Sequence, residues 1–187
     1  MLVLVVGPSG AGKDTLLNAA RAGWGDDPAV RFVRRVITRP APGTGEQDPE
    51  VFDSVTEEEF VRLRDAGGFA LWWRAHGLLY GIPADISLDL AQARTVVANA
   101  SRAVVAEAAA RFPVHVVEVT APADLLARRL VARGREDAVD VARRLSRAIE
   151  LPSPVERETV VNDGSIEQGV RKLLAALNRA TGAAPRS

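Results

Sequence analysis

The chain has 187 residues, with 24 basic and 24 acidic side chains and no cysteine. A net charge of zero gives no general attraction to nucleic acid or anionic membranes, and the lack of cysteine excludes disulfide bonds and thiolate metal sites. The length suits one domain with a substantial core, and without a signal peptide or long apolar segment we expect a cytoplasmic enzyme that binds neither nucleic acid nor membrane.

The first predicted element is a short buried parallel strand formed by the apolar residues 1–6. It leads into Gly7-Pro-Ser-Gly-Ala-Gly12-Lys13, which fits the phosphate-binding loop pattern G-x-x-x-x-G-K, and then into a helix. The loop amides would surround phosphate oxygens, while the helix N-terminus and Lys13 add positive charge. A plain glycine turn would not require the lysine, and the chain has only one other, Lys172. The predicted nucleotide-binding residues of this segment are Gly7, Pro8, Ser9, Gly10, Ala11, Gly12, Lys13, Asp14 and Thr15.

One position departs from the pattern, because Asp14 stands where Ser or Thr normally serves Mg²⁺. A carboxylate can ligate Mg²⁺ itself. In the alternative, Thr15 serves the metal and Asp14 only stabilises the positive end of the helix. Since a helix turns by about 100° per residue, the two side chains point in different directions, and we favour Asp14 as the metal ligand.

The remaining predicted elements alternate between strands and helices. In chain order they are a helix over 14–22, a strand over 30–38, a helix from Thr56 to Gly67-Gly68, a hairpin of strands 69–74 and 78–82, a strand over 95–98, a helix over 101–111, a strand over 114–120, helices over 122–134 and 138–150, a strand over 159–161 and a helix over 165–180. This alternation predicts an α/β fold with a parallel sheet covered on both faces. The hairpin region 38–82 interrupts it, as an inserted acceptor-binding lobe would, and residues 181–187 are expected to form a flexible tail.

Several polar residues follow a predicted buried strand and are candidates for substrate binding. Asn99, Ser101 and Arg102 come at its carboxyl end, where α/β folds place ligands. The two histidines, His76 at a turn and His115 inside an apolar strand, are interpreted as structural. Trp72 and Trp73 could floor a sugar pocket, but adjacent strand residues face opposite ways, so one of them is expected in the core.

Taken in order, several short motifs resemble the guanylate-kinase branch of the P-loop kinases over nearly the whole chain. They are GPSGAGKDTL, TRP (38–40), GE (45–46), EEF (58–60), GF (68–69), HG..YG (76–81), RL…RGRE (129–136), RL (144–145) and VVND (160–163). The resemblance implies a P-loop NTPase of the nucleoside-monophosphate-kinase type, with a three-layer α/β/α fold and a parallel central sheet. It also implies one kinase domain over 1–180, with an acceptor-binding insertion at about 38–82 and an arginine-rich lid at about 133–144.

The departures from guanylate kinases concern the residues that contact guanine. This chain has Leu71 in place of an acidic residue, Ile82 in place of Ser or Thr, and Asn99-Ala-Ser101 in place of D-x-D. A site that recognises a base by hydrogen bonds loses that recognition when its partners become apolar. The segments FAL.W.AHGL.YGIP and VVANASR more closely resemble the ribose 1,5-bisphosphate phosphokinase family. That resemblance implies Mg²⁺-dependent transfer of the ATP γ-phosphoryl group to the 1-phosphate of ribose 1,5-bisphosphate, a small sugar phosphate, giving 5-phosphoribosyl 1-diphosphate.

The resemblance also assigns roles to individual residues. Lys13, Arg133 and Arg144 are expected to be catalytic, the two arginines as part of the lid over the transferring phosphoryl group. Asn162 is expected beside the adenine, although an ordinary N-D-G turn is the alternative. The expected substrate-binding residues are Arg35, Arg39, Glu46, Tyr80, Asn99, Ser101 and Arg102. An acceptor phosphate is already largely ionised at pH 7, because its second pKa is about 6, so no general base is required.

Two other functions stay open at this level. The first is a guanylate-kinase-like nucleoside monophosphate kinase with relaxed base choice. The second is a non-catalytic guanylate-kinase-like interaction domain, although such modules usually lose the phosphate-binding loop or the lid arginines. A homodimer is compatible with the sequence, which does not decide the oligomeric state.

Overall fold

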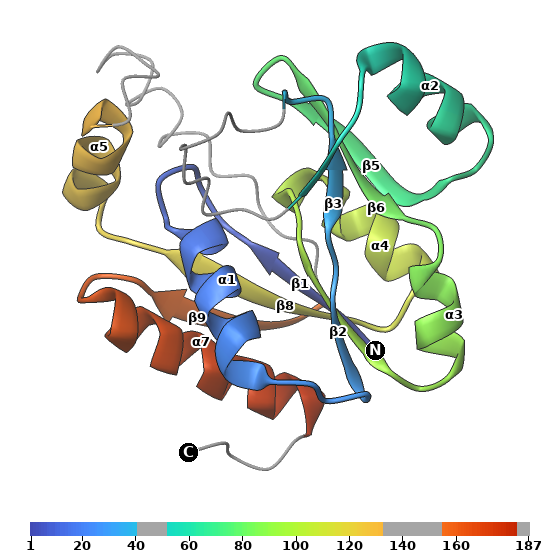
Figure 1. Ribbon diagram of the computed structural model, residues 1–187. Helices are drawn as coiled ribbons and strands as arrows, with labels where there is room; N and C mark the ends of the chain where they lie inside the picture. The colour runs from blue at the N-terminus through green and yellow to red at the C-terminus, as the bar shows by residue number, and fades with distance from the viewer. Residues whose placement is uncertain (41–51, 133–154, 183–187) are drawn as a thin grey trace.

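The structure is a computed structural model that describes residues 1–40, 52–132 and 155–182 (Figure 1). Its centre is a five-stranded sheet in which every neighbouring pair is parallel. The strand order is β2-β7-β1-β8-β9, with β1 Leu2–Val6, β2 Val30–Phe32, β7 Thr95–Asn99, β8 Val114–Thr120 and β9 Glu156–Val161. The buried runs LVLVV and TVVAN form the middle strands because both of their faces are covered.

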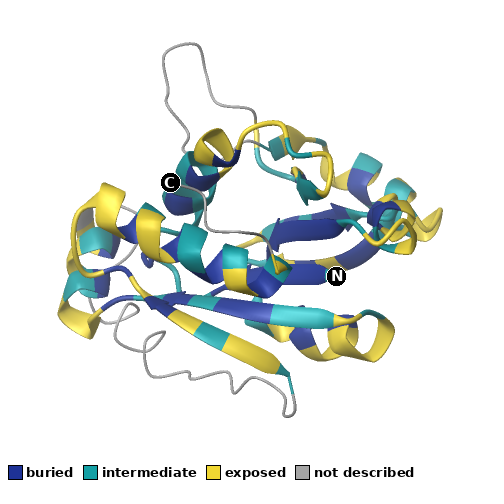
Figure 2. Ribbon diagram, turned by 90° about the horizontal axis from the view of Figure 1, so that it is seen from below, coloured by how far each residue is buried: buried dark blue, intermediate teal, exposed yellow. Residues whose placement is uncertain are grey.

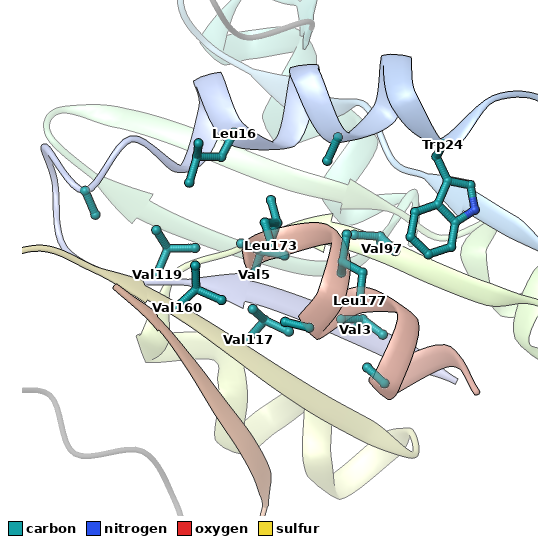
Figure 3. Packing of buried hydrophobic residues seen from close by; sticks show 14 of the residues in the cluster. Val3, Val5, Leu16, Trp24, Val97, Val117, Val119, Val160, Leu173 and Leu177 are labelled. Carbon is teal, nitrogen blue, oxygen red and sulfur yellow. The ribbon is translucent and has the colours of Figure 1, made fainter. Parts of the chain in front are cut away.

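Two long helices, α1 (Lys13–Trp24) and α7 (Ile166–Thr181), cover one face of this sheet. Figure 3 shows Leu16 and Trp24 of α1 and Leu173 and Leu177 of α7 packed around valines of the strands. The capping box of Ser165 and Gln168 fixes the start of α7. This packing holds the start of α1, and with it the end of the glycine-rich loop, against the carboxyl edge of the sheet.

The other face carries shorter elements and a second sheet. The helices there are α3 (Ile86–Ala91), the 3₁₀ turn η1 (Arg102–Val104) and α4 (Val105–Arg111). The helix α5 (Ala123–Ala132) follows β8. In Figure 2 the dark blue of buried residues is concentrated in the strands, while the helices present exposed residues outward.

The second sheet has the order β4-β3-β6-β5 and contains the predicted hairpin. Its strands are β3 Arg35–Ile37, β4 Phe52–Ser54, β5 Phe69–Ala75 and β6 Leu78–Pro83, and β5 pairs antiparallel with β6. Helix α2 (Glu57–Asp65) begins at the N-cap Thr56 and packs on this sheet through Phe60, whose ring stacks on Phe69 at 4.5 Å. The two sheets meet in one apolar cluster that includes Leu71, Trp73 and Ile82.

Several element boundaries differ from the sequence-based expectation. The strand expected over 30–38 is two strands, because the chain makes its last bond to the central sheet at Val33, whose amide donates to the Val97 carbonyl at 2.9 Å, and then joins the second sheet. Helix α1 continues through Gly23 to Trp24, which is 2% exposed and anchored in the core. Strand β9 begins three residues earlier than expected, and neither β4 nor α3 was expected.

The fold class expected from the sequence, α/β with a parallel central sheet, is confirmed. The helix expected over 138–150, the lid at about 133–144 and the tail 181–187 lie wholly or almost wholly outside the described residues. The division into one domain with an insertion and a lid therefore stays a prediction. Over the described ranges, every helix is too short or too polar to cross a membrane.

Candidate active site

A cavity of about 720 Å³ lies between the glycine-rich loop and the second sheet. It is bounded by the carboxyl ends of β1 and β7, where parallel α/β sheets bind ligands. Its lining includes Gly7, Ser9, Gly10, Gly12, Lys13, Asp14, Arg35, Arg39, Trp73, Ala75, His76, Leu78, Tyr80, Asn99, Ala100, Ser101 and Leu130. The sequence-predicted loop and the predicted acceptor lobe thus face each other across one space.

The glycine-rich loop has a backbone that side chains would not permit. Gly7 has φ +142°, and a Cβ there would lie 1.9 Å from the Val119 carbonyl oxygen. Gly12 has φ +87°, and a Cβ there would lie 2.6 Å from Nδ2 of Asn162. Lys13 Nζ donates hydrogen bonds to the carbonyls of Gly7 (2.8 Å) and Pro8 (3.1 Å), so its charge lies over the loop. The geometry is that of a compact cradle for anionic oxygen atoms.

Asn162 supports this loop from below. The residue is 6% exposed, and its side-chain Nδ2 donates to the Ala11 carbonyl at 2.8 Å. Its backbone N–H donates to the Thr120 carbonyl. The expected contact with adenine stays a prediction, because the described contacts of this side chain are with the loop. Beside it, the hydrogen bond from Lys172 lowers the pKa of the Asp163 carboxyl.

Asp14 is joined to the acceptor side by two hydrogen bonds. Its Oδ1 accepts from Asn99 Nδ2 and, at 3.3 Å, from the Arg35 guanidinium. Arg35 is almost buried, and its pairing with Asp14 links α1 to β3 across the cavity floor. Asn99 is 8% exposed, and among the described residues its Oδ1 has no hydrogen-bond partner.

Aromatic rings and cations line the acceptor side. The rings of Trp73 and Tyr80 stack nearly parallel at 5.5 Å, and the Arg35 guanidinium lies 5.3 Å from the Tyr80 ring centre. Arg39 lies over the Phe52 ring at 4.2 Å. Of the two adjacent tryptophans on β5, Trp73 lies in the wall of the cavity, whereas Trp72 is 40% exposed and stacks against Arg64.

The two histidines occupy different environments. His76 lies at the tip of the β5–β6 hairpin in the cavity lining, and its Nε2 is 3.4 Å from Ser9 Oγ of the loop. His115 lies on β8 and contacts the Glu156 carboxylate at 3.3 Å. The sequence interpretation treated both alike because it contained no signal for the distance between the hairpin tip and the loop.

Most of the sequence-predicted site residues in the described ranges line the cavity, but some do not. Arg102 turns to Glu118 at 3.6 Å, Ala11 is fully buried, and Pro8 and Thr15 are outside the lining. Glu46, Arg133 and Arg144 lie outside the described residues. Sequence reasoning missed the lining positions Ala75, Leu78, Ala100 and Leu130, which carry no polar signal. Arg129 also approaches the loop, because its guanidinium donates to the Gly10 carbonyl at 3.4 Å.

The fit to a magnesium ion depends on oxygen atoms near the loop. No group of three His, Cys, Asp or Glu side chains in the described part of the chain could hold a metal by itself. Mg²⁺ at phosphate sites usually takes one or two protein oxygens and completes its octahedron with phosphate and water. The Asp14 carboxylate and the buried Oδ1 of Asn99 are hard oxygen ligands next to the loop, so the residues present fit this mode.

Comparisons with known proteins agree with this geometry. The chain is 44% identical over 180 residues to the ribose 1,5-bisphosphate phosphokinase PhnN of Rhizobium etli, covering 95% of this chain and 89% of that protein. It is 48% identical over 179 residues to the bifunctional ribose 1,5-bisphosphokinase-thymidine phosphorylase of Cupriavidus necator, covering 95% of this chain but only 29% of that longer protein. No family model matches the chain.

Among solved structures, the chain is similar to guanylate kinase from Anaplasma phagocytophilum. The TM-score is 0.70 over 97% of this chain and 86% of that chain, at 18% sequence identity. At this identity the similarity establishes the fold alone, and the activity must be argued from the site and the closer relatives.

Proposed function

The chain belongs to the ribose 1,5-bisphosphate phosphokinase (PhnN) family, and from this premise we propose that it phosphorylates the 1-phosphate of ribose 1,5-bisphosphate with ATP. An oxygen of the 1-phosphate attacks the γ-phosphorus of ATP, the bond from that phosphorus to the β-phosphate oxygen breaks, and ADP leaves. The product is 5-phosphoribosyl 1-diphosphate. The observation that carries the proposal is 44% identity along almost the full length of both this chain and the relative from Rhizobium etli.

The donor side supports ATP as the phosphoryl source. Loop glycines and the first residues of α1 line the cavity, and Lys13 adds a full positive charge beside them. Phosphoryl transfer needs alignment and neutralisation of charge more than covalent participation by the protein. Lys13 is accordingly assigned to the ATP phosphates, and the lid arginines Arg133 and Arg144 stay predictions of the family resemblance.

The acceptor side supports a phosphorylated sugar without a base. In the described residues its polar lining consists of cations, an imidazole, hydroxyl groups and the Asn99 amide. The positions that contact guanine in guanylate kinases hold Leu71 and Ile82, which are fully buried in the core. Trp73 fills the adjoining wall with its ring. Guanine presents N–H donors that need a carboxylate, and the carboxylate in the described lining, Asp14, lies at the start of α1 beside the glycine-rich loop, where it is assigned to the metal.

The substrate-binding residues are assigned by charge and position. Arg35 and Arg39 suit the two phosphate groups, and Ser101, just after the carboxyl end of β7, suits a ribose hydroxyl. Asn99, expected from the sequence to bind substrate, is assigned instead to the metal, because its Nδ2 donates to Asp14 and leaves only Oδ1 for a ligand. Tyr80 forms the aromatic wall with Trp73. Arg102, which pairs with Glu118 outside the lining, is a weaker candidate than expected from the sequence.

Asp14 and the Oδ1 of Asn99 would hold Mg²⁺, which when bound would neutralise phosphate charge. No general base is assigned, because a phosphate monoester is mostly ionised near pH 7. The Arg35 bond to Asp14 keeps a cation and a carboxylate side by side between the donor and acceptor halves of the cavity.

The test is an acceptor comparison with purified protein, ATP and magnesium. Ribose 1,5-bisphosphate and GMP are offered separately, ADP release is followed, and the product is identified by its ³¹P diphosphate signals. We expect turnover of ribose 1,5-bisphosphate with kcat/KM at least about 100-fold above that for GMP, because the cavity lacks partners for the base. Turnover of GMP with no reaction of ribose 1,5-bisphosphate would instead make the protein a guanylate kinase.

A further inference from the structure

His76 occupies an unusual backbone conformation at the tip of the β5–β6 hairpin. Its φ is +52° and that of Gly77 is +74°. Two consecutive positive φ values are those of a type I′ turn, whose first position favours Asn, Asp or Gly. A histidine is therefore held at a position where glycine would fit with less strain, and such outliers concentrate at functional sites.

This conformation places the His76 imidazole in the cavity, next to the glycine-rich loop. His76 lines the cavity, and its Nε2 lies 3.4 Å from the hydroxyl of Ser9 on the glycine-rich loop. The hairpin belongs to the second sheet, on the acceptor side of the cavity, whereas Ser9 belongs to the glycine-rich loop, on the ATP side. The ring thus lies between the two parts of the cavity that a phosphoryl group has to cross, and the cations Arg35 and Arg39 line the same cavity.

We propose that His76 is a further substrate-binding residue, which donates a hydrogen bond from its ring to a non-bridging oxygen of the phosphoryl group in transfer. The inference rests on the proposed phosphotransferase function and adds one residue to that site. An imidazole N–H suits an anionic oxygen, and charge-assisted hydrogen bonds of this type are among the stronger ones. The ring forms no covalent bond and removes no proton, since the acceptor phosphate is already ionised.

The test compares two substitutions that keep the turn. His76→Gly removes the ring and suits the positive φ, and His76→Asn keeps a side-chain N–H on a residue that tolerates the left-handed region. For His76→Gly we expect kcat to fall by about 10- to 100-fold, with KM for ATP and acceptor within about threefold, the pattern of a contact made mainly in the transition state. The midpoint of thermal unfolding should equal or exceed that of the wild type. His76→Asn should retain more activity than His76→Gly.

The matched control is His115→Gln, which removes the other histidine, remote from the cavity, and should leave kcat unchanged. A folded His76→Gly protein that turns over at the wild-type rate would overturn the proposal, and so would a folded His76→Asn protein that is no more active than His76→Gly. All variants are assayed with whichever acceptor the wild-type protein uses. If the wild-type protein phosphorylates GMP alone, the proposed substrate is wrong. The same variants assayed with GMP then still test the role of His76.

Discussion

Asp14 occupies the position at which phosphate-binding loops normally place a hydroxyl for magnesium. Its hydrogen bonds within the described residues, from Asn99 and Arg35, are both accepted by Oδ1. A carboxylate oriented in this way can offer its other oxygen to a hard cation. Thr15, the alternative ligand, is outside the cavity lining, which favours Asp14.

The substitution Asp14→Asn should raise the free Mg²⁺ concentration needed for half-maximal velocity by about tenfold or more, because it removes the charged ligand oxygen. The measurement is the rate of ADP release against free Mg²⁺ at saturating ATP and acceptor. Thr15→Val is the matched control and should leave this concentration unchanged. If Asp14→Asn has the wild-type magnesium dependence and Thr15→Val does not, the metal is held by Thr15.

At the residue scale, the sequence predicted those site positions that belong to a local pattern. The glycine spacing and Lys13 define the loop without reference to the rest of the fold, and the polar residues after a buried strand indicated Asn99 and Ser101. His76 could not be recognised, since its role depends on a distance between segments 67 residues apart. Arg102 was placed near ligand by chain position alone, but Glu118 on β8 attracts it away from the cavity lining.

At the scale of elements, the turn after β9 holds the glycine-rich loop in place. Asn162 ties the loop to β9 through the Ala11 carbonyl, and Gly12 and Gly169 leave room for its side chain. The loop is therefore held by a residue that follows β9 and lies 151 positions from Ala11 in the sequence. An amide buried in this way is costly to remove, because the carbonyl it serves stays buried.

Asn162→Ala should lower the free energy of unfolding by about 1–3 kcal/mol, since the Ala11 carbonyl loses its donor in a buried site. Urea unfolding followed by circular dichroism measures this change as a lower midpoint at constant slope. The control is Asp163→Ala at the next residue, which loses an exposed pair with Lys172 and should leave the midpoint nearly unchanged, because exposed ion pairs contribute little to stability. Equal losses in the two variants would mean that Asn162 does not support the loop.

Elements with long, uniform patterns were predicted, and short or composite ones were not. The middle strands β1 and β7 are buried, largely apolar runs, so their pattern alone identifies them. The prediction for the 30–38 segment was wrong because apolar residues recur along its whole length, while the chain changes sheets after Val33. Helix α3 is six residues long and β4 is three, too short for periodicity to indicate either.

At the scale of the whole molecule, the two sheets divide the work between donor and acceptor. The parallel sheet carries the glycine-rich loop at its carboxyl edge, and the mixed sheet carries the aromatic and cationic wall. The Arg35–Asp14 pair and the Ser9–His76 contact join the two halves across the cavity. A non-catalytic interaction domain would need neither the intact loop nor a lysine in it. Whether ATP binding depends on Lys13 therefore distinguishes a kinase from such a domain.

Lys13→Ala should abolish most of the stabilisation that ATP and magnesium give to the folded protein. At about 100 times its Kd, ATP stabilises the wild type by about 2.7 kcal/mol, a rise in Tm of about 5–10 °C for a chain of this size. A 100-fold weaker Kd in the variant leaves only about 0.4 kcal/mol, and a Tm shift below about 2 °C. Scanning calorimetry with and without ATP measures both shifts.

The matched control is Lys172→Ala, which removes the only other lysine, an exposed one bonded to Asp163 and the Val161 carbonyl. It should keep the full ATP-dependent shift, because a lysine outside the cavity lining does not reach the nucleotide phosphates. Since the shift is a difference between two measurements on the same variant, any loss of intrinsic stability cancels from it. A full ATP-dependent shift in Lys13→Ala would mean that ATP does not bind through Lys13. The glycine-rich loop would then be a structural turn in a binding module.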